Sequence, residues 1–155
     1  LQLLKDSNIT LKDGTLKSSK AVFLIQNYSN LTLDNMTLTL TNANRNDCYT
    51  VSNNNGNTVI KDTTINANTN GRVAFDVCRY SSYPSVSVTV QNSTINGNIE
   101  VTASSNDAKD GFSLTLESGT LSGDVVLADS AKAAMQATPF GLRRVSRTWL
   151  WFSPA

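Results

Sequence analysis

One nine-residue pattern recurs five times in this chain and limits what it can fold into. The first copy is NITLKDGTL, and the later copies are NLTLDNMTL, NTVIKDTTI, SVTVQNSTI and SLTLESGTL. Each copy has an aliphatic residue at the fourth position, and these residues are Leu11, Leu33, Ile60, Val90 and Leu116. They are separated by 22, 27, 30 and 26 residues. A constant motif with variable spacing predicts stacked structural units joined by loops of different length.

Within each copy, apolar and polar residues alternate, the alternation breaks at a short polar or Gly-containing segment, and then it resumes. This pattern predicts a strand, a bend and a second strand. The first inward column should contain Ile9, Leu31, Thr58, Val88 and Leu114. A second inward column should contain Leu16, Leu38, Ile65, Ile95 and Leu121. Four of the five residues in the first column and all five in the second are aliphatic, which indicates a shared apolar core.

The bend itself forms a column of short polar residues: Asp13, Asn35, Asp62, Asn92 and Ser118. Next to it runs an unbroken threonine column: Thr15, Thr37, Thr64, Thr94 and Thr120. Residues with short oxygen acceptors satisfy backbone N–H groups in turns. The alternative, a calcium site, would need Asp13 and Asp62 together, but two coils separate them by about 10 Å. We therefore interpret the column as turn residues.

A third strand is predicted in each repeat, in the segments AVFLI, CYTV, VAFDV, NIEV and DVVL. A coil of three short strands cannot close its own core, but coils stacked about 4.8 Å apart pair each strand with its neighbours. We therefore expect an all-β parallel solenoid of about five coils over residues 8–130, rather than the alternative β-sandwich. Residues 1–7 would form a cap or partial strand.

Residues 131–155 differ in composition from the repeats. Arg143, Arg144 and Arg147 lie close to Trp149 and Trp151 in the sequence. We interpret this stretch as a non-repeat C-terminal tail, a cap or a truncated junction. The alternative is a segment that binds an anionic ligand or a membrane surface.

Composition excludes several function classes. The net charge of +1 offers no broad attraction for nucleic acid, and no apolar stretch is long enough for a membrane span. Histidine is absent, which removes the commonest general base and the commonest metal ligand. We predict no cofactor, no metal site, no nucleic-acid partner and no membrane insertion.

The stacked motif resembles the right-handed parallel β-helix, or pectin-lyase-like, class over about residues 8–130. This resemblance implies the right-handed coil. The class includes polysaccharide lyases and hydrolases, phage tailspikes and adhesin-like regions of bacterial surface proteins, and the Asn- and Thr-rich coils here are most similar to the last group. It implies a secreted or cell-surface, bacterial module within a larger protein with flanking domains, acting as a rigid scaffold or recognising a polysaccharide or host glycan. The lyase or hydrolase alternative lacks its carboxylate–calcium or Asp–His constellation here, so we predict no catalytic residues.

The best candidate ligand-binding residues lie on the long-loop side of the second and third coils. Arg72, Asp76 and Arg79 supply charge beside long loops, where a groove can form. Tyr80 and Tyr83, in the segment RYSSYPS, can stack on sugar rings. The bland alternative is that these are ordinary loop tyrosines and solvated ion pairs.

Cys48 and Cys78 are the only two cysteines. Each lies twelve residues before an aliphatic of the repeat motif, so we expect them to stack on adjacent coils, about 4.8 Å apart. This separation permits a disulfide, although stacked parallel strands orient both side chains alike. A disulfide and a pair of buried thiols both remain open.

Overall fold

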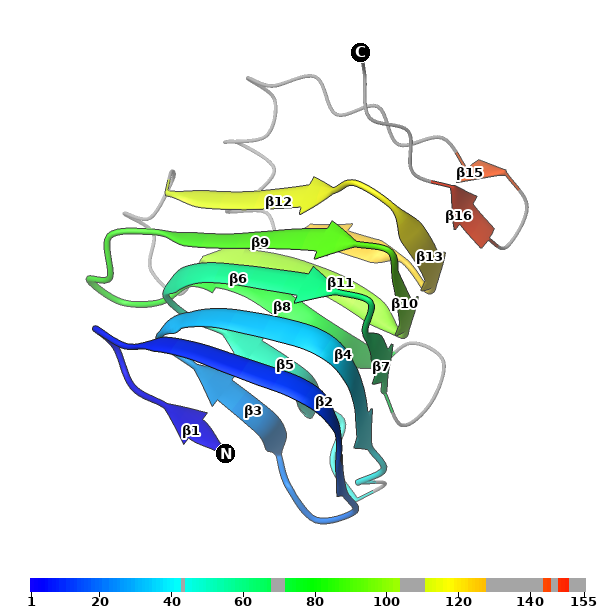
Figure 1. The fold of residues 1–155 in the computed structure, drawn as a ribbon, viewed down its shortest axis with the longest axis horizontal. Helices are drawn as coiled ribbons and strands as arrows, with labels where there is room; N and C mark the ends of the chain where they lie inside the picture. Colours follow the sequence, from blue (N-terminus) through cyan, green and yellow to red (C-terminus); the bar gives the residue numbers. More distant parts are fainter. Residues whose placement is uncertain (43, 68–71, 104–110, 128–143, 146–147, 151–155) are drawn as a thin grey trace.

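The computed structural model describes residues 1–42, 44–67, 72–103, 111–127, 144–145 and 148–150. Every regular element in these ranges is a β-strand, and the strands stack as a parallel β-solenoid of about four turns (Figure 1). The strands are β1 Gln2–Leu3, β2 Asn8–Ser18, β3 Phe23–Asn27, β4 Asn30–Leu40, β5 Tyr49–Asn53, β6 Gly56–Lys61, β7 Thr64–Asn66, β8 Val73–Arg79, β9 Val86–Gln91, β10 Ser93–Asn96, β11 Asn98–Ala103, β12 Phe112–Leu116, β13 Gly119–Ser122, β14 Val125–Leu127, β15 Arg144–Val145 and β16 Thr148–Leu150. The predicted solenoid is confirmed. The count is about four rather than five, because five stacked copies of the motif enclose only four steps of the stack.

The strands form two sheets that face each other across the core. The six-stranded sheet has the order β1-β3-β5-β8-β11-β14 and contains the third strand of each repeat. The ten-stranded sheet contains the repeated motif and bends within each rung, so that β2 and β4 run through the bend while later rungs are split into pairs such as β6 and β7. All pairings between successive coils are parallel.

Both inward columns and the threonine column have the predicted register. The strand pairings join Ile9 to Leu31, then to Thr58, Val88 and Leu114. The second column and the threonine column are joined in the same way from β2 to β13. Full burial of an aliphatic side chain stabilises the fold by roughly 1.5–3 kcal/mol, so these columns are its main source of stability.

Thr58, the polar exception in the first column, has a structural explanation. Its hydroxyl donates to Asn53 Oδ1 at 2.9 Å and accepts from Asn27 Nδ2 at 3.0 Å. All three side chains are buried, with exposures of 0–1 %. The hydroxyl therefore joins two buried amides, which also bond to each other, with Asn27 Nδ2 donating to Asn53 Oδ1 at 3.3 Å.

The bend column owes its polar residues to backbone conformation. Asp13, Asn35, Asp62 and Asn92 have φ values of 52°, 53°, 50° and 44°, in the left-handed region that Asn and Asp tolerate better than other residues with a side chain. In the last rung Gly119 takes this role, with φ 131° and Ser93 O only 2.1 Å from where a Cβ would lie. The prediction of a turn column is confirmed. The left-handed backbone conformation is a second reason why Asp and Asn occupy it.

The column side chains also bond along the stack. Asn35 Nδ2 donates to Asp13 Oδ1 at 2.8 Å, and Asn92 Nδ2 donates to Asp62 Oδ1 at 2.6 Å. The two carboxylates thus each have an amide donor on the next coil. This pairing fits a structural role for the two aspartates.

The predicted C-terminal tail, 131–155, falls mostly outside the described residues, including Arg143, Arg147 and Trp151. The described part is a hairpin of β15 and β16. Strand β16 pairs antiparallel with β13, with Leu150 opposite Thr120 and Trp149 opposite Leu121.

Candidate functional site: the tyrosine–carboxylate face

The outer side of the six-stranded sheet departs most from the repeat. Consecutive residues Leu24 and Ile25 are both buried in the core, as are Ala74 and Phe75 two levels along the stack. A register shift between β8 and β11 marks the same level. A β-bulge of this kind changes which side chains point outward. The Tyr49 hydroxyl reaches Glu100 of β11, two strands along the sheet.

Two carboxylates are cross-strand neighbours on this side. Asp76 of β8 pairs with Glu100 of β11. Asp76 is 6 % exposed, and its Oδ1 accepts from the Asn53 amide at 2.5 Å while its Oδ2 accepts from the Ser52 hydroxyl at 3.3 Å. The Tyr49 hydroxyl donates to Glu100 Oε2 at 2.8 Å.

Burial changes the acidity of Asp76 and of the Tyr49 hydroxyl. Burial, together with the nearby Glu100 charge, raises the pKa of Asp76 to about 8, despite the hydrogen bonds from Asn53 and Ser52 that lower it. Burial and the bond to Glu100 raise the pKa of the Tyr49 hydroxyl. Asp76 is therefore a neutral acid at pH 7, next to a carboxylate that accepts a hydrogen bond from tyrosine.

Three tyrosines form an aromatic cluster next to the carboxylates. The Tyr28 ring lies 5.5 Å from the Tyr83 ring and 6.2 Å from the Tyr80 ring, centroid to centroid, the latter in an edge-on arrangement. Burial is the main cause that raises the Tyr28 pKa, followed by the charges of Tyr80 and Tyr83 and then of Cys78 and Asp76. The Tyr28 hydroxyl accepts from Gln26 Nε2 at 3.1 Å, and Gln26 pairs with Ser52, whose hydroxyl donates to Asp76. Tyr80 is 44 % exposed. We call these side chains, with Tyr49, Asp76 and Glu100, the tyrosine–carboxylate face.

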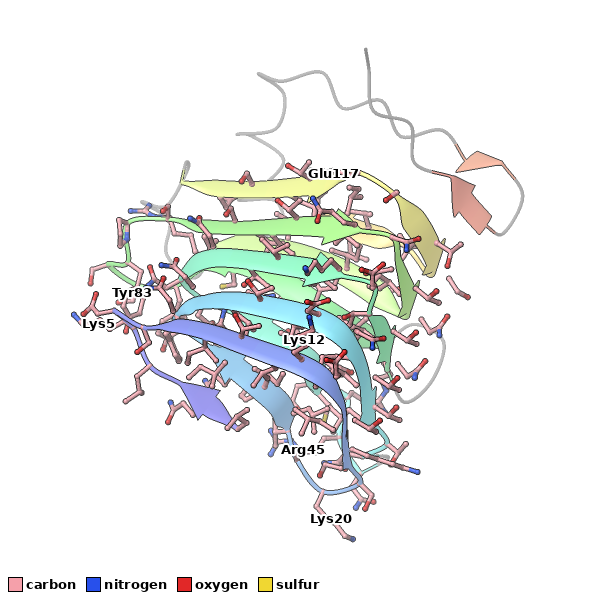
Figure 2. The ribbon with its side chains drawn as sticks, viewed as in Figure 1. Lys5, Lys12, Lys20, Arg45, Tyr83 and Glu117 are labelled. Atoms are coloured by element: carbon pink, nitrogen blue, oxygen red, sulfur yellow. The ribbon has the colours of Figure 1, made fainter. Side chains whose placement is uncertain are left out.

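The loop that carries two of these tyrosines is held in place by main-chain bonds. The Tyr83 amide donates to Tyr80 O at 3.2 Å, and Ser81 between them has φ 53°. Arg79 Nε donates to Tyr83 O at 3.0 Å, and Asn55 Nδ2 donates to Tyr28 O at 2.8 Å. Both sides of the cluster are therefore anchored to the solenoid (Figure 2, where Tyr83 lies in the loop before β9).

Four of the five predicted ligand-binding residues lie together. Asp76, Arg79, Tyr80 and Tyr83 are at one end of β8 and in the loop that follows it. Arg72 lies before the other end of β8, where its guanidinium donates to Arg45 O. It is therefore not part of the tyrosine–carboxylate face.

Sequence reasoning missed Tyr28, Tyr49 and Glu100. The chain has four tyrosines, and all four lie on this face. Glu100 could have been found by aligning VAFDV with NIEV, since the two carboxylates then fall in the same column. Tyr49 could not, because its partner Glu100 lies two strands along the sheet, on β11.

The predicted stacking of the cysteines is wrong. Strand pairing sets Tyr49 opposite Val73, so that Cys48 lies before the start of β5 and Cys78 lies near the end of β8. Both cysteines are buried thiols. Counting back from the motif failed because the connection 80–85 before β9 is longer than the connection 54–55 before β6.

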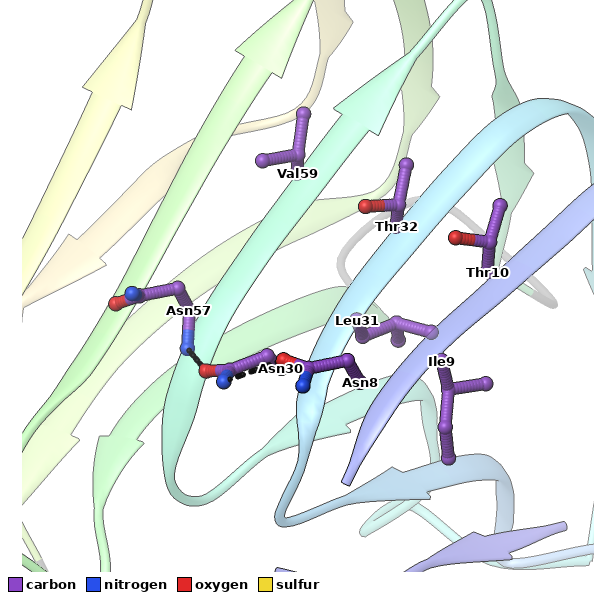
Figure 3. A pocket seen from close by; sticks show the side chains of 8 residues that line it. All are labelled: Asn8, Ile9, Thr10, Asn30, Leu31, Thr32, Asn57 and Val59. Carbon is purple, nitrogen blue, oxygen red and sulfur yellow. Dashed lines mark hydrogen bonds between the residues drawn. The ribbon is translucent and has the colours of Figure 1, made fainter. Parts of the chain in front are cut away.

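A second surface feature is a shallow groove of about 330 Å³ on the motif strands (Figure 3). A row of Asn8, Asn30 and Asn57 borders one side, and the other side is bordered by Thr10, Thr32 and Val59. The asparagines bond to one another: Asn30 Nδ2 donates to Asn8 Oδ1 at 3.0 Å, and Asn30 Oδ1 accepts from the Asn57 amide at 3.0 Å. We interpret this row as part of the stack.

Across the described ranges, no three His, Cys, Asp or Glu side chains gather where they could hold a metal ion. The described part of the chain also has no helix of the length and apolar character that a membrane crossing requires. No known protein-family model, curated protein or solved structure matches this chain.

Proposed function

We propose that this chain is a non-catalytic β-solenoid module of a secreted or cell-surface protein, which holds the tyrosine–carboxylate face rigidly toward a carbohydrate. The observation that carries the proposal is the cluster of Tyr28, Tyr80 and Tyr83, together with the fourth tyrosine, Tyr49, whose hydroxyl bonds to Glu100. Tyrosine combines a flat apolar ring with a polar hydroxyl, which suits the faces and hydroxyls of a sugar.

The rigid scaffold supports this role. Tyr28, Tyr49 and the loop of Tyr80 and Tyr83 belong to levels of the stack that are fixed by parallel pairing of β3, β5 and β8. Their hydroxyls and rings are therefore held in place before a ligand arrives, which lowers the entropic cost of binding. The Glu100 side chain adds oxygen acceptors for sugar hydroxyls.

The alternative is a polysaccharide lyase or glycoside hydrolase, and the observation that favours it is the neighbouring pair of a protonated Asp76 and Glu100. Retaining glycosidases place two carboxyl groups about 5–5.5 Å apart, one as acid and one as nucleophile. Burial of Asp76 behind its bonds to Asn53 and Ser52 weighs against proton delivery to a glycosidic oxygen. This function therefore ranks second.

The test is a polysaccharide panel with and without calcium, in which binding and the release of reducing or unsaturated ends are recorded together. We expect binding without cleavage, and its loss in the double variant Tyr80→Ala/Tyr83→Ala. The matched control is Thr37→Ala/Thr94→Ala, on the exposed threonine column, which should bind like the parent. Cleavage that depends on Glu100 would establish the enzyme instead, and binding unchanged in the tyrosine variant would refute the proposed face.

A further inference from the structure

The two ends of the solenoid carry complementary edges. At the N-terminal end, β2 pairs only with β4 among the described strands. Its inward residues Ile9, Leu11 and Leu16 are only partly buried, whereas their counterparts on β4 are 0–1 % exposed. An unpaired edge of this length offers backbone donors and acceptors together with an incomplete apolar column.

At the C-terminal end, the last rung presents the other side of the same columns. Strand β12 pairs with β9, and no other described strand pairs with its far edge. Strand β13 pairs with β10 on one edge and with β16 on the other. The antiparallel strand β16 thus covers the part of the edge that would otherwise continue the parallel stack.

The columns of the last rung match those of the first in phase. Continuing the register of the stack by one more step would set Leu114 beside Ile9, Leu116 beside Leu11 and Leu121 beside Leu16. It would also bring the bend at Gly119 beside the bend after Asp13, so the two L-shaped rungs have the same outline. A reversed, two-fold arrangement of β2 against itself would not superimpose these outlines.

Charge on the outer surface favours the same arrangement. The column that includes Lys12 continues through Asp34, Lys61, Gln91 and Glu117. Asp34 Oδ2 lies 3.3 Å from Lys12 Nζ and 3.1 Å from Lys61 Nζ, and Gln91 Nε2 donates to Glu117 Oε2 at 2.9 Å. The column thus ends in a cation at one end of the solenoid and an anion at the other.

We propose that the N-terminal edge formed by β2 binds the last rung of a second copy of this chain, which extends the solenoid head to tail once β16 leaves β13. Such an interface uses two different surfaces, so it does not close on itself and produces filaments. Strand β16 acts as a cap that keeps the chain monomeric while it is paired. The proposal is independent of the glycan-binding face, because the two surfaces share no residue.

The test uses the full chain with Leu150→Pro, which removes a backbone donor from the strand opposite Thr120. Sedimentation should show the parent as a monomer and the variant as species that grow with concentration, with thin filaments by electron microscopy. In that background, Lys12→Glu or Glu117→Lys should abolish growth, and the two together should restore it because opposite charges again meet. A folded Leu150→Pro variant that stays monomeric at every concentration, or growth indifferent to both charge reversals, would overturn the proposal.

A second measurement covers the case in which Leu150→Pro does not fold. A labelled peptide with the sequence of residues 112–122 presents β12 and β13 without β16 and should bind the parent chain saturably by fluorescence anisotropy. Binding should be lost with Lys12→Glu and absent for a scrambled peptide. Failure of the native peptide to bind would overturn the proposal on its own.

Discussion

The bend columns and the tyrosine–carboxylate face are built on the same coils but follow opposite rules. Along the bend, short polar residues stack on one another, and in the threonine column each residue stacks on another threonine, as Thr94 does on Thr64 and Thr120. On the other face, unlike residues meet, and Asp76 lies between Ser52 and Glu100. Because the sequence repeats, equivalent positions of successive coils stack in register. The bend columns are part of this repeated pattern, which determines the fold. The departures from repetition mark where a ligand would be recognised.

Phe75 and Asp76 are neighbours on β8, but Phe75 belongs to the repeated core and Asp76 to the tyrosine–carboxylate face. Substitutions at these two residues should therefore have different effects. Phe75 is fully buried in the core, so Phe75→Ala should lower the free energy of unfolding by about 3–5 kcal/mol. Urea denaturation monitored by circular dichroism measures the loss. A cost below about 1 kcal/mol would mean that the six-stranded sheet does not close the core as described.

The adjacent residue, Asp76, should make the free energy of unfolding depend on pH. Below the unfolded-state pKa of about 3.9, Asp76 is protonated in both the native and the unfolded state. In that pH range its titration does not lower the free energy of unfolding. As pH rises toward about 8, the unfolded chain releases this proton while the native protein retains it. The free energy of unfolding should therefore fall between about pH 4 and 8, on the order of a few kcal/mol, and level off above.

Asp76→Asn tests this assignment because it keeps the shape and removes the titration. Its unfolding free energy should fall less over that pH range than that of the parent. Glu100→Gln removes the neighbouring charge that raises the Asp76 pKa, so the pH at which the fall levels off should move lower. Parallel pH profiles for the parent and Asp76→Asn would show that another group is responsible.

A smaller effect is expected at the bend. Asn35→Ala places a residue that disfavours the left-handed region at φ 53° and removes the bond to Asp13, at a cost of about 1–2 kcal/mol. Asn35→Gly loses the same bond but tolerates the conformation, and should cost less. Equal destabilisation by both variants in thermal melts would mean that the side-chain bond, not the backbone, dominates.

The smallest effect should come from the exposed threonine column. Thr94→Ala removes a hydroxyl with one long bond to Thr120, 3.4 Å, and should change the free energy of unfolding by no more than about 0.5 kcal/mol. Chemical denaturation in parallel with the parent measures it. A decrease in the free energy of unfolding of more than about 1 kcal/mol would contradict this prediction, because it would show that the threonine column stabilises the fold by more than its hydrogen bonds explain.

Sequence reasoning succeeded where the structure repeats. The inward columns could be read from the motif because Leu33, Ile60 and Val90 occupy the same position in every copy, and stacked strands must align such positions. It failed at Cys48 and Cys78, because a longer loop shifts the sequence count without shifting the strands. The candidate face was found only in part, since the Tyr49–Glu100 bond joins residues two strands apart in the sheet and has no sequence motif of its own.

The most direct test of the central claim maps a bound oligosaccharide from the polysaccharide panel onto the ¹⁵N-labelled protein by nuclear magnetic resonance. If the ligand binds the tyrosine–carboxylate face, amide signals of β5, β8, β11 and the loop 80–85 should shift on titration, while those of β6, β9 and the bend should not. Shifts confined to the groove of Asn8, Asn30 and Asn57, or to the bend columns, would contradict it.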